Sequence, residues 1–208
     1  PAISPEYAIG KLSAGAKKEL TIYTEDQVGQ NILEGFLPND LLRRVHIVPI
    51  GSDQAVLKQL AAAYRDHNYA CLAFCDGDKR NCYETAVKQV RNHLESLVNS
   101  DFEEWISKRL KYLPGDMWPE KYLLEVLNNN MIVRKELSER WRMDGTFDDE
   151  IIDQAISAGK HSEFYMLAQQ LNLDESQVRM DVIRAVADVV PNKIMLICQN
   201  VVEILGCR

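Results

Sequence analysis

Apolar positions in the first half of the chain follow two different spacings. Short runs rich in apolar and β-branched residues, expected to be strands, occupy 20–23, 45–50 and 69–75. Between them, apolar residues recur every three or four positions over 28–36 and 56–64, which is the spacing of an amphipathic helix. The run 69–75 is apolar throughout, as is typical of a central parallel strand buried on both faces. This β-α-β-α-β order predicts a parallel sheet with right-handed crossovers.

The second half of the chain is mostly helical in its spacing. Apolar stripes of helical period begin near Ala86 and continue to the end of the sequence, interrupted by a short fourth strand candidate at 110–113. Pro119 suits the first turn of a helix, because the N–H that it lacks has no intrahelical partner there. We therefore predict an α/β fold: a parallel sheet of about four strands flanked by helices, with a largely helical C-terminal half.

The patterning also predicts three segments. We interpret 1–19 as a linker or extension from a missing upstream domain, 20–125 as an α/β domain, and 126–208 as a helical region packed on it. The chain begins with Pro1 rather than Met and shows no charged-then-apolar leader, so we expect a segment of a longer polypeptide.

Composition excludes several classes of protein. Of the 208 residues, 46% are hydrophobic and 26% are charged, as in ordinary globular proteins, and no apolar run approaches the roughly 18 residues of a membrane helix. Five irregularly spaced cysteines predict structural thiols in a reducing cytoplasm rather than a disulfide framework. The net charge of -7 argues against a basic nucleic-acid coat, so contact with DNA would need a cation, a local basic patch or a basic partner.

Three acids directly follow two of the predicted strands. Glu25 comes after the first strand, and Asp76 and Asp78 come after the third, with Gly77 between them to let the loop curl. In open parallel sheets ligands bind beyond the carboxyl ends of the strands. For any one of these acids alone, a helix cap or an ordinary turn is the simpler interpretation. Their common position favours a site for one or two hard cations, Mg²⁺ or Mn²⁺.

These residues resemble a known family. A strand followed by Glu and, about 50 residues later, a strand followed by Asp-x-Asp is similar to the Toprim domain of topoisomerases, primases and nucleases. The closer likeness is to the Toprim region of the OLD (overcoming lysogenization defect) family of ATP-dependent nucleases, and it covers roughly residues 20 to 125. The stretches that carry it are Ile22–Asp26, His46–Ser52, Phe74–Arg80, Leu113–Gly115 and Pro119-Glu120.

The resemblance implies a role for each of four acids. Glu25 corresponds to the family's invariant acid, which binds metal or transfers a proton. Asp76 and Asp78 correspond to its metal-binding pair, and Glu120 to the extra acid that OLD-type nucleases use for a second ion. The implied activity is metal-dependent hydrolysis of phosphodiester bonds in DNA.

The sequence also departs from the family. Asp26 stands where many Toprim domains have Gly, and Gly29 stands where some OLD nucleases carry another acid, so a second metal site is open to question. The chain contains no G-x-x-x-x-G-K-[ST] motif for ATP. The resemblance therefore implies an ATPase domain upstream, and it is compatible with a homo-oligomer or with a partner protein of an anti-phage defence system.

Several basic residues are candidates for stabilising the negative charge that develops on a phosphate. Lys79, assigned a catalytic role, and Arg80 follow the acidic pair directly, whereas Lys160 and Lys193 are distant alternatives. For each of them a solvated surface charge is the simpler interpretation. His161 is either a proton shuttle or ligand, or a cap or packed ring at the start of a helix.

Two other classes of function fit the same acids. A receiver-like domain would accept a phosphoryl group on Asp76, but it needs a lysine after a fifth strand, and no such strand is predicted. In a non-catalytic assembly module, the helical half would bind a partner and the acids would serve no reaction. Metal binding and DNA cleavage distinguish these alternatives from the nuclease.

Overall fold

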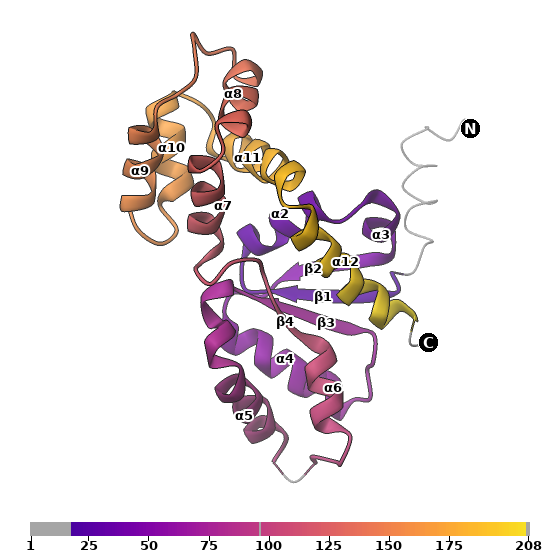
Figure 1. Ribbon diagram of the computed structural model, residues 1–208. Helices are drawn as coiled ribbons and strands as arrows, with labels where there is room; N and C mark the ends of the chain where they lie inside the picture. The colour runs from indigo at the N-terminus through magenta and orange to yellow at the C-terminus, as the bar shows by residue number, and fades with distance from the viewer. Residues whose placement is uncertain (1–17, 96, 207–208) are drawn as a thin grey trace, which may run out of the picture.

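The computed structural model describes residues 18–95 and 97–206, and its elements follow the predicted order (Figure 1). Four strands form one all-parallel sheet with the order β2-β1-β3-β4, which confirms the predicted fold class. Residues 1–17 of the predicted extension, and Cys207, lie outside the described residues. The strands are β1 (Leu20–Thr24), β2 (Val45–Pro49), β3 (Cys71–Cys75) and β4 (Leu110–Tyr112).

Helices cover both faces of the sheet. The side chains of β3 alternate between them: Leu72 and Phe74 join one apolar cluster, and Cys71, Ala73 and Cys75 join the other. Both of these cysteines are buried and unbridged, as expected of structural thiols. The first face is covered by α2 (Gln27–Phe36), α3 (Asn39–Arg44) and α12 (Pro191–Gly206), and the second by α4 (Asp53–Arg65), α5 (Tyr83–Leu94) and α6 (Phe102–Arg109).

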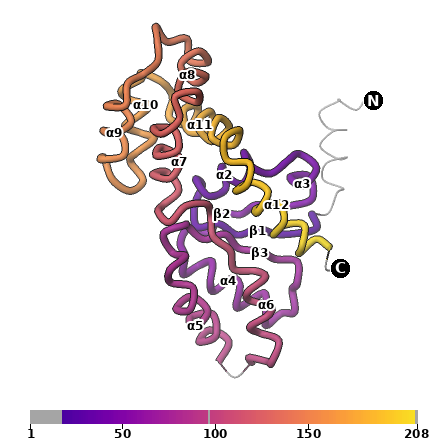
Figure 2. Tube along the Cα trace, in the orientation of Figure 1, coloured from indigo at the N-terminus to yellow at the C-terminus, as the bar shows by residue number. Residues whose placement is uncertain are grey.

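The remaining helices form a lobe that extends away from one end of the sheet (Figure 2). Its helix α11 packs against α2, and one continuous apolar cluster runs from the sheet face into this lobe. The predicted boundary between residues 125 and 126 falls inside α7, so the division into two domains stays a prediction. The helices of the lobe are α7 (Pro119–Asn128), α8 (Met131–Arg140), α9 (Asp149–Ser157), α10 (Glu163–Leu171) and α11 (Glu175–Val189).

Backbone hydrogen bonds fix the loop that follows β1. The N–H of Ile50 donates to the carbonyl of Thr24 at 3.0 Å, and the N–H of Gly51 donates to that of Glu25 at 2.7 Å. Asp26 caps α2, because its Oδ1 accepts the N–H of Gly29 at 2.9 Å. These bonds hold Glu25 and Asp26 at the carboxyl edge of the sheet.

Gly77 opens the short 3₁₀ helix η1 (Gly77–Cys82) after β3. We expected it to let the loop curl, but its φ is not among the positive values found at glycines. A Cβ on Gly77 would instead lie 2.5 Å from the carbonyl oxygen of Gly115 and 2.9 Å from that of Met117. Glycine is therefore required because the loop before α7 passes directly over it.

Within the described ranges, no single helix is both long enough and apolar enough to cross a membrane. The pair α11 and α12 meets the length and composition criteria only when counted together, and the two helices are bent by 97° at their junction.

Candidate functional site at the carboxyl edge of the sheet

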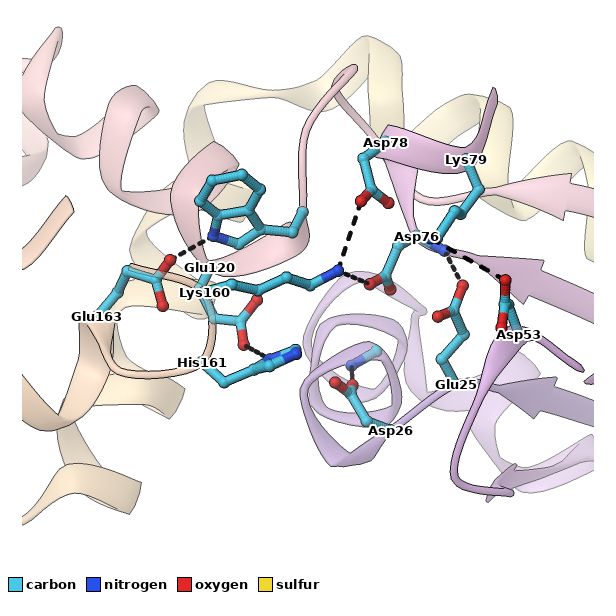
Figure 3. A network of polar contacts seen from close by, with 12 residues as sticks. Glu25, Asp26, Asp53, Asp76, Asp78, Lys79, Glu120, Lys160, His161 and Glu163 are labelled. Atoms are coloured by element: carbon cyan, nitrogen blue, oxygen red, sulfur yellow. Dashed lines mark hydrogen bonds and ion pairs between the residues drawn. The ribbon is translucent and has the colours of Figure 1, made fainter. Parts of the chain in front are cut away.

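Glu25 and Asp76 meet because β1 and β3 are neighbouring strands. The carboxylate of Glu25 accepts the backbone N–H of Asp76 at 2.9 Å, so it lies within hydrogen-bond reach of the loop that carries the acidic pair (Figure 3). This arrangement is the one expected from strands one and three lying side by side.

The acidic pair faces a lysine from the helical lobe rather than the lysine beside it in sequence. The ammonium of Lys160 lies 3.8 Å from Oδ2 of Asp76 and 3.4 Å from Oδ2 of Asp78 (Figure 3). Lys79 lies 4.0 Å from Oδ2 of Asp53, the first residue of α4. Lys160, the candidate that is distant in the sequence, therefore contacts the predicted metal-binding pair. Lys79 contacts Asp53 instead.

Each aspartate of the acidic pair has one buried oxygen without a hydrogen-bond partner among the described residues. Asp76 is 2% exposed, and its Oδ1 is buried with no hydrogen-bond partner among the described residues. Oδ1 of Asp78 is also buried and also has no hydrogen-bond partner among the described residues. A buried carboxylate oxygen without a donor is costly, and a divalent ion with oxygen ligands relieves that cost. Asp76 and Asp78 thus carry oxygens that a cation would satisfy, but together with Glu25 they do not form a described group whose ligand atoms all lie within 4.8 Å of one another.

Electrostatics at this edge oppose ionisation of the acids. Burial raises the pKa of Asp76 to about 8, and the nearby carboxylates of Glu25 and Asp26 act in the same direction. Burial also raises the pKa of Glu25, although the N–H donated by Asp76 opposes the shift. Burial acts to lower the pKa of Lys160, but Asp78 and Asp76 outweigh it, so this pKa is raised and the amine is an ammonium at neutral pH.

Glu120, predicted as a ligand of a second ion, lies in a group with Asp26 and His161. In the part of the chain that the structure describes, one set of three potential ligands has donor atoms within 4.8 Å of one another: Asp26, Glu120 and His161. Nδ1 of His161 lies 2.9 Å from Oε1 of Glu120 (Figure 3). This Asp-Glu-His group could hold a metal ion, and it does not include Asp76 or Asp78.

The other basic candidates, Arg80 and Lys193, lie away from the acidic pair. Arg80 donates to the carbonyl of Leu113 at 2.9 Å and lies 3.5 Å from a carboxylate oxygen of Asp116, so it holds the loop before α7. Lys193 lines a separate pocket together with Arg80. Neither residue forms an ion pair with the acidic pair in the described structure.

The sequence analysis missed two features of the site. Asp53 was not considered, although it follows β2 and so lies at the same sheet edge as the other acids; the rule applied to β1 and β3 would have found it. The role of Asp26 in the Asp-Glu-His group was also missed. No local pattern links Asp26 to His161, because 135 positions separate them in the sequence.

Comparisons with known proteins find only distant similarity. No family model matches the chain, and no curated protein matches it. Two solved structures of the C-terminal region of the OLD protein of Xanthomonas campestris pv. campestris are similar to it. The structure phased with platinum is 14% identical with a TM-score of 0.41, covering 91% of this chain and 94% of that chain. The structure phased with mercury is 13% identical with a TM-score of 0.46, covering 91% and 97%.

Proposed function

We propose that this chain is the nuclease part of a metal-dependent endonuclease that hydrolyses phosphodiester bonds in DNA. The observation that carries the proposal is the buried pair Asp76 and Asp78, whose unpartnered oxygens lie beside Glu25 and a lysine at the carboxyl edge of a parallel sheet. The motifs that resemble those of the Toprim region of OLD nucleases contribute the same three acids.

Each side chain of the site would have its own role in phosphodiester hydrolysis. Glu25, Asp76 and Asp78 would hold one or two ions, and a divalent ion bound there would supply an activated water and neutralise charge on the phosphoryl oxygens. Lys160 is placed to neutralise a further phosphoryl oxygen, because its ammonium already faces the acidic pair. Glu25 is fixed by the Asp76 N–H and orients the reacting groups. Lys79 is the weaker candidate, since Asp53 engages it.

The charge of the chain affects its contact with DNA, and the resemblance suggests its other partners. The net charge of -7 repels DNA at long range, so contact with DNA depends on bound cations and on a more basic neighbour. We propose an upstream ATPase domain as that neighbour, and a role in anti-phage defence in the cytoplasm. A homo-oligomer or a defence-system partner protein would supply the remaining contacts.

Cleavage of supercoiled plasmid by the chain in Mg²⁺ or Mn²⁺ tests the proposal. We expect nicked or linear products that disappear with EDTA and with Asp76→Asn, whereas Asp66→Asn, at an exposed site paired with Arg65, retains activity. A chain that binds the ions but leaves plasmid intact, and instead takes a phosphoryl group on Asp76 from acetyl phosphate, would be a receiver-like domain. A chain that neither binds Mg²⁺ or Mn²⁺ nor melts at a higher temperature with them would be an assembly module.

A further inference from the structure

We propose that Asp26, Glu120 and His161 form a separate cation site that prefers a transition-metal dication to Mg²⁺. This site is distinct from the acids at the end of β3, and the proposal stands whether or not those acids cleave DNA. Three observations carry it: the position of the donor atoms, the burial of Glu120, and the distribution of charge around the group.

The donor atoms already have the spacing of a ligand set. One ligand atom from each residue lies within 4.8 Å of the others, and all three residues line one pocket of about 390 Å³. Ligands around a transition metal stand about 2.0 to 2.2 Å from the ion, so such a group needs only small side-chain adjustments to surround one. The pocket provides the entry path that a metal site requires.

Glu120 provides independent support for a ligand. Its side chain is 3% exposed at the start of α7, and its Oε2 is buried with no hydrogen-bond partner among the described residues. Its Oε1 contacts His161, which leaves the second oxygen of the carboxylate unsatisfied. A buried, unpaired carboxylate oxygen in a ligand-spaced group is the condition that a bound cation relieves.

The charges around the group also favour a cation. None of the described lysines or arginines forms an ion pair with Asp26 or Glu120. Arg179 lines the same pocket, but it is paired with Glu175. Within the described part of the chain, the basic side chain that pairs with Glu120 is therefore His161, while Oδ1 of Asp26 also accepts the N–H of Gly29.

In two turns, neighbouring residues face different sites: one residue of each pair faces the acidic pair and the next faces Glu120. Glu25 faces Asp76 while Asp26 faces Glu120, and Lys160 faces the acidic pair while His161 faces Glu120 (Figure 3). His161 adopts a left-handed backbone, with φ of 70°. An ion bound to His161 would therefore anchor the turn that presents Lys160 to the first site.

The ligand types indicate the class of metal. Mg²⁺ binds oxygen ligands in near-ideal octahedral geometry and keeps several waters, whereas imidazole nitrogen suits transition metals. One imidazole with two carboxylates is thus a mixed nitrogen and oxygen set that Mn²⁺, Co²⁺ or Zn²⁺ fits better than Mg²⁺ does. Mn²⁺ is the practical probe, because its unpaired electrons report a nitrogen ligand directly.

Titration of the chain with Mn²⁺ in excess Mg²⁺, followed by calorimetry and by pulsed electron paramagnetic resonance, tests the site. We expect one Mn²⁺ that Mg²⁺ does not displace, with nitrogen coupling in its spectrum. His161→Ala should remove the coupling and weaken Mn²⁺ binding by about tenfold or more, since even outer-shell changes at metal sites have effects of that size. His161 is 55% exposed, so its removal leaves the fold intact.

Matched variants distinguish this site from the acidic pair. His93→Ala, at an exposed position on α5, should change nothing, and Asp76→Asn should retain the Mn²⁺ with its nitrogen coupling. Glu120→Gln, which keeps the size of the side chain, should weaken binding as His161→Ala does. The proposal is overturned if Mg²⁺ displaces all bound Mn²⁺, or if the nitrogen coupling is absent or survives His161→Ala.

Discussion

Asp76 is a carboxylic acid held in an environment that disfavours its charge. It is 2% exposed at the end of β3, near Glu25 and Asp26, and Oδ1 has no donor among the described residues. Such a group costs stability when it ionises without a cation, and carboxyls with strongly perturbed pKa values cluster at functional sites. At the scale of single residues, this side chain is the strongest mark of a functional site.

The pKa of Asp76 predicts that metal binding releases a proton. In the unfolded chain this carboxyl titrates at roughly 3.9, and in the folded chain its pKa is about 8, so near pH 7 the folded site holds a proton that the ion must displace. We expect the apparent affinity of the chain for Mg²⁺ to rise by up to about tenfold per pH unit up to pH 8. Calorimetry in buffers of different ionisation enthalpy measures the proton, and buffer-independent heats would contradict this prediction.

The same shift sets the sign of the pH dependence of stability. Between about pH 4 and 8 the folded state keeps a proton on Asp76 that the unfolded chain has lost, so the metal-free protein loses stability progressively as the pH rises through that window. Asp76→Asn removes this penalty. We expect the free energy of unfolding of the variant to fall less steeply with pH than that of the unaltered chain, as measured by urea denaturation without metal. Parallel pH profiles for the two proteins would be evidence against the raised pKa.

We expect removal of Lys160 to lower activity much more than removal of Lys79. Lys160 faces Asp76 and Asp78, so Lys160→Ala should lower plasmid cleavage by about 10²- to 10³-fold, the range for loss of one charge-stabilising group. Lys79→Ala should lower it far less, because Lys79 contacts Asp53 at 4.0 Å. Both side chains are more than one third exposed, so neither change should alter the melting temperature markedly. Equal losses in the two variants would contradict the assignment to Lys160.

At the scale of elements, turns and the first residues of helices present the site. The turn after β1 carries Glu25 and Asp26, η1 carries Asp78, and the turn between α9 and α10 carries Lys160 and His161. Backbone contacts hold two of these segments: the turn after β1 is bonded to Ile50 and Gly51, and the carbonyl of Gly115 passes close to Gly77 of η1. A rigid sheet edge with tightly packed loops is the usual way to fix the geometry of a site.

Gly77→Ala should disturb that packing. The added Cβ would lie 2.5 Å from the carbonyl oxygen of Gly115, and backbone on both sides would have to move, at a cost of roughly 1 to 3 kcal/mol in the free energy of unfolding. We also expect weaker metal binding, because Asp76 and Asp78 flank the glycine. Gly206→Ala, where no atom lies within 4 Å of the added Cβ, is the matched control for chemical denaturation. Equal stability of the two variants would contradict the close approach.

At the scale of the whole molecule, the lobe and the sheet share one apolar cluster. Ile183 of α11 is fully buried and packs so closely against α2 that no side chain fits at Gly35. The lobe contributes His161 and Lys160 to the sites, so the docking of the two parts sets the distance between the lysine and the acidic pair. Shared packing therefore has a functional consequence as well as a structural one.

Ile183→Ala should weaken the whole fold rather than the lobe alone. Removal of this buried side chain should lower the free energy of unfolding by about 2 to 5 kcal/mol and shift a single calorimetric transition to lower temperature. Ile132→Ala, at a side chain that is 78% exposed, should change it by less than about 0.5 kcal/mol. Two separate transitions would show that the lobe and the sheet unfold independently.

Local sequence patterns were sufficient to predict the sheet and the position of the acids that follow β1 and β3. The apolar run at 69–75 predicts a doubly buried strand because both of its faces must leave water, and the acids that follow β1 and β3 must lie at one edge once these strands pair in parallel. The receiver-like alternative needed a fifth strand, and the described residues contain four. The acidic character of the site and its position in the chain were therefore determined by the sequence itself.

Tertiary structure alone decided which groups face those acids. Lys160 lies 82 positions from Asp78, and it reaches the acidic pair only because the lobe packs across the end of the sheet. The same packing places Glu120 with Asp26 and His161 instead of with Asp76. Sequence spacing carries no information about such pairs, since long-range contacts depend on how buried apolar surfaces fit together. The sequence by itself determined the edge of the sheet where the acids lie; the fold determined the cations and ligands that meet them there.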